Sequence, residues 1–170
     1  MIFMSQSAIT TPERESEWDR WYIDHLRIMV TVPGISSAQR FKTETPDYPR
    51  SLAMYSIASP DVFSDAYYQS IRGLGEWAQL VDRRYYRRNL FDGAERAPGV
   101  NVGHVLLVAD RDTPEAGLAD VDWKWLTCVG VDLSTPYRGI AVVDRKTGER
   151  AASSANVALY VPATMPVGPT

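Results

Sequence analysis

His25 is one of two histidines in this 170-residue chain, and it lies among aromatic residues. An imidazole that faces an apolar cavity is a candidate general base, because burial lowers its pKa and keeps it unprotonated at neutral pH. It would take a proton from a bound carbon acid or phenol. The alternative is a core histidine whose ring N–H donates to a backbone carbonyl. The sequence leaves both interpretations open.

Tyrosine hydroxyls and one arginine are the other groups that could act on the same molecule. Tyr22 could donate a hydrogen bond to a developing enolate or phenolate, although such tyrosines also pack with the hydroxyl at the surface. Arg40 could bind a carboxylate or carbonyl, or be a solvated charge at a sheet edge. His25 and Tyr22 are the catalytic candidates. The candidate substrate-binding residues are Trp18, Trp21, Met29, Arg40, Tyr55, Tyr67 and His104.

Several other chemistries lack their sequence motifs. The single cysteine, Cys128, excludes an internal disulfide framework and a thiolate zinc cluster. Two distant histidines without a carboxylate pattern do not predict a metal site, and His25 is the one candidate axial ligand for a haem. No Gly-rich phosphate loop follows a strand and no G-x-S-x-G motif is present. We therefore expect no metal and no cofactor.

Composition indicates a soluble globular protein, with 45% apolar and 23% charged residues. The net charge of −3 argues against nucleic acid as a partner. The basic and aromatic cluster at residues 83–88 is therefore interpreted as a solvated or intersubunit strand face. The first eight residues do not form a signal peptide, and no apolar run approaches the length of a membrane span, so a cytoplasmic location is expected.

Residues 11–34 are predicted to form the helix that positions His25. Thr11 and Pro12 supply a start signal, and Pro33 followed by Gly34 supplies a stop signal. Between them, large side chains recur at the spacing of one helical face. These residues are Trp18, Trp21, Tyr22, His25, Met29 and Val32.

The surrounding elements follow the order strand, helix, strand, strand, helix, strand. We expect strands at residues 1–8, 35–42, 51–57 and 83–91, and a second helical segment from residue 59, broken near residues 64–65 and at Gly73 and Gly75. This order is the plan of a ferredoxin-like unit, whose sheet has helices on one face only. The other face requires a cover, such as a second copy of the unit.

A degenerate second copy is predicted after residue 98. Thr113-Pro114-Glu115 repeats Thr11-Pro12-Glu13, and strands are expected at residues 103–110, 137–144 and 157–161. Residues 126–133 suit a strand or a loop, and the copy lacks room for its final helix and strand. The predicted organisation is a first repeat at 1–98, a second at 99–162 packing on the first, and a loose tail at 163–170.

The stretch EWDRWYIDHLRIMVTVPGISSAQRF, followed by PRSLAMYSIASPDVFSDAYY, resembles the EthD-like branch of the dimeric α+β barrel superfamily. The resemblance implies a ferredoxin-like α+β fold, here as a tandem pseudo-repeat with a truncated second copy. It also implies small hydrophobic or aromatic compounds bound in a pocket bounded by sheet and helix. His25 matches the family's W-Y-x-x-H helix, whereas Arg27 and Ile28 replace its usual Pro and Glu.

These observations predict a cofactor-independent enzyme that uses histidine general acid/base proton transfer on a small aromatic or polyketide-like molecule. A lyase, isomerase or cyclase is the expected reaction type. Alternatives are a cofactor-free monooxygenase of the same fold, or a binding or assembly module without turnover. Unpaired sheet edges in the truncated copy predict a homodimer.

Overall fold

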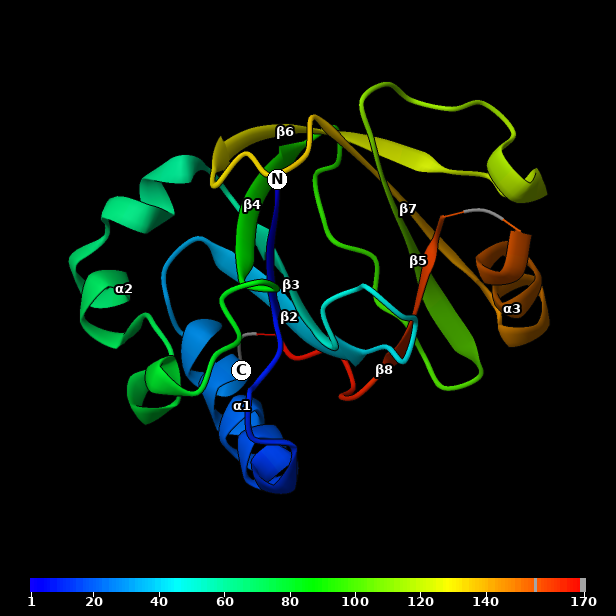
Figure 1. The fold of residues 1–170 in the computed structure, drawn as a ribbon. Helices are drawn as coiled ribbons and strands as arrows, with labels where there is room; N and C mark the ends of the chain where they lie inside the picture. Colours follow the sequence, from blue (N-terminus) through cyan, green and yellow to red (C-terminus); the bar gives the residue numbers. More distant parts are fainter. Residues whose placement is uncertain (155, 169–170) are drawn as a thin grey trace.

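The protein is described here from a computed structural model that covers residues 1–154 and 156–168. Its eight strands form one closed antiparallel barrel in the order β1-β3-β2-β8-β5-β7-β6-β4 (Figure 1). The strands are β1 (Ile2–Ser7), β2 (Ile35–Lys42), β3 (Ser51–Ile57), β4 (Arg87–Asp92), β5 (His104–Arg111), β6 (Lys124–Val131), β7 (Tyr137–Asp144) and β8 (Ala158–Pro162). The α-helices are α1 (Glu15–Met29), α2 (Ala66–Ile71) and α3 (Arg145–Ser154).

The predicted fold class, a ferredoxin-like dimeric α+β barrel with a truncated second copy, is wrong. The eight strands close on one another within a single chain, and few helices accompany them. The closure depends on two junctions, in which Phe41 of β2 pairs with Pro162 of β8 and Phe91 of β4 pairs with Cys128 of β6. The second half is also not truncated, because it contributes four neighbouring strands and α3.

Barrel closure removes the unpaired strand edges from which a homodimer was predicted. Each strand of the described residues has hydrogen-bonded neighbours on both sides. The homodimer stays a prediction, but exposed edges no longer support it.

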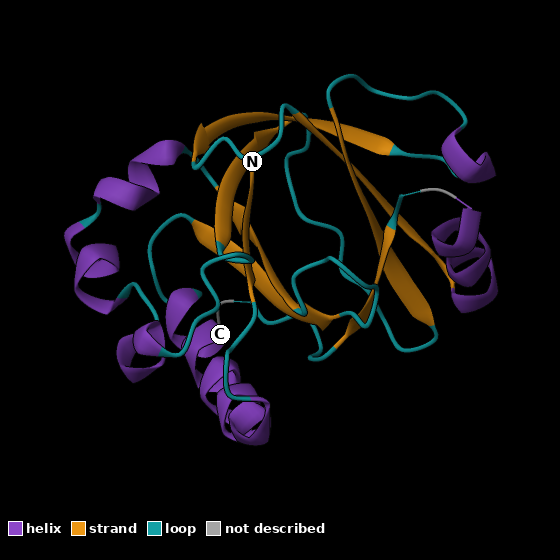
Figure 2. Cartoon of the chain, in the orientation of Figure 1, coloured by secondary structure: helices purple, strands orange, loops and turns teal. Residues whose placement is uncertain are grey.

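Alternation along the strands separates two hydrophobic layers. Met4, Met54 and Phe91 point into the barrel, where they join an apolar core completed by residues from all eight strands. Their neighbours in sequence point outward, and Phe3, Tyr55 and Leu90 pack beneath α1 and α2. Helices therefore lie outside the barrel, α1 and α2 on one side and α3 on the other (Figure 2).

Helix α1 buries a stripe that is shifted by part of a turn from the predicted one. Its buried residues are Trp18, Tyr22, Leu26 and Met29. Trp21 and His25 are half-buried at the border of this stripe. A short 3-10 turn, η1 (Pro12–Arg14), precedes the helix, and Thr11 makes no side-chain cap. His25 is consequently placed at the edge of the helix–sheet layer.

The segment after β3 is broken where the sequence predicted it to be. Two 3-10 turns, η2 (Pro60–Ser64) and η3 (Gly75–Gln79), flank α2. Asp65 interrupts the helical path with an extended backbone, and its carboxylate accepts a hydrogen bond from the backbone N–H of Tyr68 at 2.9 Å. Gly73 has φ of +101°, a conformation that favours glycine. The breaks turn Tyr68 toward the sheet.

Within residues 1–154 and 156–168, no helix has the length and apolar character needed to cross a bilayer.

Candidate functional site

A small cavity of about 50 Å³ lies between the sheet, α1 and the segment that contains α2. It is lined by residues of β1, β3, α1, α2 and β4, and by residues that follow α2 and precede β4. Its polar lining residues are Ser5, Tyr22, His25, Tyr55, Tyr68, Arg72, Tyr86 and Arg88. We call this the His25 cavity.

His25 enters this cavity as an unpaired imidazole. Its ring stacks on Trp21, with 4.7 Å between centroids, and meets the edge of Tyr22 at 5.8 Å. Its ring nitrogens bond no other residue in the described part of the chain, so the histidine bonded to a backbone carbonyl is not what the structure contains. Burial without a partner lowers the pKa of His25 to about 4, and the ring is neutral at pH 7.

Tyrosine hydroxyls form the opposite wall of the His25 cavity. Burial raises the pKa of Tyr22, although Arg40 and hydrogen bonds with Ser5 and Tyr55 partly offset this effect. Burial also raises the pKa of Tyr55, whose O–H donates to Tyr22. Tyr68 and Tyr86 complete the set, and burial raises the pKa of each. All four hydroxyls are therefore hydrogen-bond donors at neutral pH.

Arg88 brings a buried donor to the same cavity. Its Nη2 approaches the Asp132 carboxylate at 3.4 Å, and its guanidinium lies 5.6 Å from the Tyr86 ring centroid. Its Nε is buried and has no hydrogen-bond partner in the described structure. The cavity therefore combines a proton acceptor with an unused cationic donor, a pairing suited to an anion formed by deprotonation.

Five of the predicted site residues do not line the His25 cavity. Trp21 only stacks behind His25, while Trp18 and Arg40 line a second, smaller cavity. Tyr67 is exposed and bonds Thr31 at 3.0 Å between hydroxyls. His104 is exposed at the start of β5. The predicted residues that the cavity does bring together are Tyr22, His25, Met29 and Tyr55.

Tyr68, Tyr86 and Arg88 are cavity residues that the predicted site omitted. Tyr68 could not be distinguished from Tyr67 because the break at Asp65 resets the helical phase. Tyr86 was placed in the middle of a predicted strand, whereas β4 begins at Arg87. An alternation argument that started from Arg87 would have separated outward Arg88 from inward Asn89.

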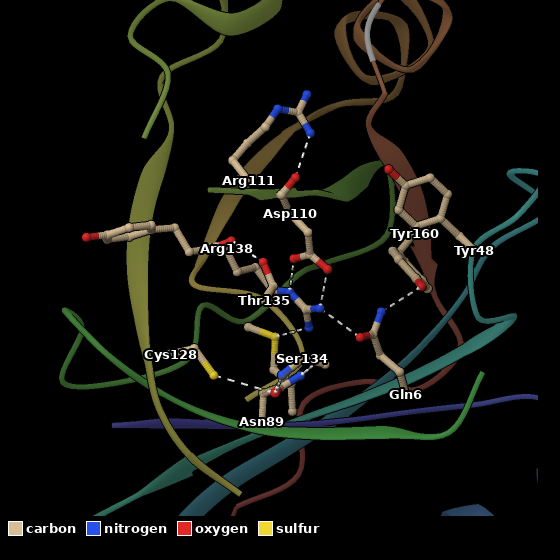
Figure 3. Close-up of polar contacts among 12 residues, drawn as sticks. Gln6, Tyr48, Asn89, Asp110, Arg111, Cys128, Ser134, Thr135, Arg138 and Tyr160 are labelled. Carbon is tan, nitrogen blue, oxygen red and sulfur yellow. Dashed lines mark hydrogen bonds and ion pairs between the residues drawn. The ribbon is translucent and has the colours of Figure 1, made fainter. Parts of the chain in front are cut away.

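A second polar cluster lies inside the barrel, near one of its ends (Figure 3). Arg138, with 1% of its side chain exposed, makes a bidentate ion pair with Asp110 at 2.7 Å for both contacts. Its Nη2 also donates to Gln6 at 2.8 Å. Burial opposes the charged form, but Asp110 outweighs it and raises the pKa of Arg138. We interpret this satisfied network as structural.

Nearby, Asn89 connects two strands to the turn before β7. Its Nδ2 donates to Ser134 Oγ at 2.7 Å, and its Oδ1 accepts from the Ser134 backbone N–H at 2.9 Å (Figure 3). Cys128 approaches the same Oδ1 at 3.5 Å, and burial raises the pKa of its thiol. The cysteine is therefore a protonated packing group.

Neither cluster resembles a metal centre. Among the described residues, no group of three or more His, Cys, Asp or Glu side chains is placed to hold an ion. The His25 cavity has room for a few water molecules, whereas pockets for drug-sized ligands have about 300–1,000 Å³.

Comparison with solved structures gives a fold neighbour from Lactobacillus acidophilus NCFM that is named a "putative monooxygenase". The TM-score is 0.59 with 7% sequence identity, over 96% of this chain and 94% of the other. No protein-family model and no curated protein matches the sequence. The neighbour supports the fold in general terms and does not test the EthD-like branch. It conflicts with the lyase, isomerase or cyclase expectation, which we withdraw.

Proposed function

We propose that the chain is an enzyme that oxidises a small enolisable molecule with O2 at the His25 cavity, without a resident cofactor. One observation carries the proposal: a neutral imidazole and Arg88, whose Nε is buried, line the same cavity, and neither His25 nor that Nε has a hydrogen-bond partner among the described residues. The name of the Lactobacillus acidophilus neighbour supports an oxygen-using reaction. We also propose that the chain is related to EthD-like proteins, which residues 17–68 resemble.

The substrate is a molecule with an activated CH2 group whose enol form is phenolic or stabilised by a carbonyl. His25 accepts one proton from that carbon, and Arg88 with the tyrosine hydroxyls stabilises the enolate. The carbanion carbon bonds O2, and the imidazolium returns its proton to give a hydroperoxide. Loss of the second hydrogen with the distal oxygen releases water and leaves a ketone. The carbon supplies four electrons, one oxygen atom enters the product and the other leaves as water.

The low pKa of His25 restricts this chemistry to acidic carbon acids. An imidazole with a pKa of about 4 is a weak base. Proton transfer would be slow if the pKa of the substrate were much higher than that of the imidazole. An enolate formed beside the ring would in turn stabilise the imidazolium and raise the pKa. We therefore expect activity on doubly activated CH2 groups first.

Substrate entry requires the His25 cavity to enlarge. Residues 72–74, between α2 and η3, form part of its wall, and the positive φ angles of Gly73 and Gly75 place adaptable residues in that segment. The unpaired donor and acceptor groups of the cavity would also serve a second candidate function, a binding or assembly module without turnover.

Oxygen uptake with acetylacetone and with anthrone tests the proposal. We expect O2 consumption to depend on protein, and one ¹⁸O atom from ¹⁸O2 to enter the ketone product. His25→Asn should lower the rate by about 100-fold, and Arg88→Gln by about 10-fold. Tyr67→Phe is the matched control, because Tyr67 points away from the cavity, and it should retain the wild-type rate.

The alternative outcomes separate the candidates. Saturable binding of either probe, lost in His25→Asn but without O2 uptake, would establish the binding module. Oxygen uptake that persists in His25→Asn would refute His25 as the base.

A further inference from the structure

Arg40 is a buried cation with an unused donor on the other side of the α1 aromatic layer. Only 1% of its side chain is exposed. Its Nη1 forms an ion pair with Asp19 at 2.8 Å, and its Nε donates to Ser51 Oγ at 3.0 Å. Its Nη2 is buried and has no hydrogen-bond partner in the described structure. A buried charged N–H without an acceptor is costly, so an acceptor is expected there.

A cavity of about 30 Å³ lies beside this guanidinium, separate from the His25 cavity. Arg40, Ser51, Arg50 and Glu15 line its polar side, and Trp18 and Pro12 line its apolar side. Ser51 Oγ accepts from Arg40 and can donate its own proton into the cavity. Among the described residues, the Arg50 side chain has a single ion-pair contact, 3.8 Å from Glu15, so its guanidinium is also available. Three residues with hydrogen-bond donors therefore border one small space, together with the Glu15 carboxylate.

The charge balance around this space favours an anion. Arg40, Lys42 and Arg50 contribute three positive charges, and Glu15 and Asp19 contribute two negative ones. The surplus is one positive charge next to the unpaired Nη2. Ser7, which pairs with Ser51 across β1 and β3, adds another buried hydroxyl without a partner.

The cavity continues into a surface groove of about 420 Å³. The two hollows share Ala8, Ile9 and Arg50 as lining residues. The outer groove is acidic, because Glu44 and Asp47 line it without an ion-pair partner among the described residues. The inner cavity therefore favours a single negative charge, whereas the outer groove would repel a second one.

We propose that Arg40, Ser51 and Arg50 form a binding site for a small organic monocarboxylate, whose uncharged or cationic remainder lies in the outer groove. About 10–15 Å³ holds one water, so the inner cavity accommodates a carboxylate group and little more. The site is distinct from the His25 cavity and does not depend on its function.

Titration of the ¹⁵N-labelled protein with sodium acetate tests the site. The Arg40 Nε–H resonance, assigned by its loss in Arg40→Met, should shift saturably with acetate and not with sodium chloride at equal ionic strength. We expect a dissociation constant on the order of 1–10 mM. Succinate should bind about tenfold more weakly than acetate because of Glu44 and Asp47.

Variants distinguish a specific binding site from non-specific electrostatic attraction. Backbone amide shifts and calorimetry report binding in variants that lack the Arg40 signal. Ser51→Ala and Arg50→Gln should each weaken acetate binding about three- to tenfold, and Arg40→Met more than tenfold. Arg20→Met removes an exposed cation from the other side of α1 and should leave the affinity unchanged.

Three results would overturn the proposal. One is an Arg40 resonance that responds equally to acetate and chloride. Another is acetate affinity that survives both Ser51→Ala and Arg50→Gln, two changes that leave the Arg40–Asp19 pair intact. The third is succinate binding more tightly than acetate.

Discussion

The guanidinium carbon of Arg40 lies 4.4 Å from the centroid of the Tyr22 ring. Tyr22 lines the His25 cavity, and Arg40 lines the small cavity beside Ser51. One stacked pair therefore separates the two hollows, and the cation on one side opposes the rise in the Tyr22 pKa on the other. A change in the charge of Arg40 is transmitted to the His25 cavity through this contact.

Loss of Arg40 should destabilise the fold more than loss of an exposed arginine. Arg40→Met removes the partner of Asp19, but Lys42 still contacts that carboxylate at 2.7 Å. We expect the free energy of unfolding in urea to fall by about 2–3 kcal/mol. Arg27→Met, which breaks an exposed pair with Asp24, should cost less than about 1 kcal/mol. Equal losses in both variants would contradict the buried role of Arg40.

The stability of the protein should depend on pH through His25. Its folded pKa of about 4 lies below the unfolded value near 6.5, so the unfolded chain binds more protons between these pH values. The free energy of unfolding therefore includes the full contribution of the neutral His25 ring above about pH 6.5. It loses this contribution as the pH falls toward 4. Wild type should lose about 2 kcal/mol more than His25→Asn between pH 7 and pH 4.

His104→Asn is the control for that measurement, because His104 is exposed at the start of β5. It should follow the wild-type pH profile. A His25→Asn profile parallel to wild type over the whole range would show that the folded ring is protonated as readily as the unfolded one. Proton NMR of the His25 ring provides an independent measurement of its pKa.

Removal of the negative charge from the Arg138–Asp110 ion pair inside the barrel should destabilise the protein more than removal of a nearby surface charge. Asp110→Asn removes the negative charge that balances the buried Arg138 and one of the two oxygens that accept from it. We expect a loss of about 3–5 kcal/mol in the free energy of unfolding. Asp112→Asn, at an exposed position two residues away, should change stability by less than about 0.5 kcal/mol. A loss below 1 kcal/mol for Asp110→Asn would disprove the buried pairing.

The absence of a side chain at Gly139 leaves room for two tryptophans to pack against β7. A Cβ at this position would lie 2.9 Å from Trp123 Cε3 and 3.1 Å from two Trp125 ring atoms. Gly139→Ala should therefore destabilise the protein by about 1–3 kcal/mol, measured by thermal unfolding. Gly130→Ala in β6 is matched to it, because its Cβ meets Leu90 at an ordinary 3.6 Å, and it should have a smaller effect.

Local sequence patterns predicted the elements of the first half well. The expected strands at residues 35–42 and 51–57 coincide with β2 and β3, and the helix break fell at Asp65. These features depend on alternation and caps within a few residues. Helix α3 was missed because residues 145–154 carry almost no large apolar side chains. Gly148 instead lies so close to the barrel that a Cβ there would clash with Val105.

Local sequence patterns could not predict which strands pair when they lie far apart in the chain. The junctions of β2 with β8 and of β4 with β6 join segments far apart in the chain, and no turn signal marks them. Without them, exposed edges and a truncated copy were expected. The same limitation affected the site: His25, Tyr22 and Tyr55 were found from the α1 pattern and the tyrosine inventory, whereas Arg88 reaches the cavity through the β1–β4 pairing.

The β2–β8 junction has a consequence for synthesis on the ribosome. Lys42 emerges early but finds its partner Val161 only after more than a hundred further residues have been translated. Until then the nascent first half carries a free β2 edge, which is a template for pairing with other chains. The newly made polypeptide should therefore engage holdase chaperones until its last strand leaves the exit tunnel.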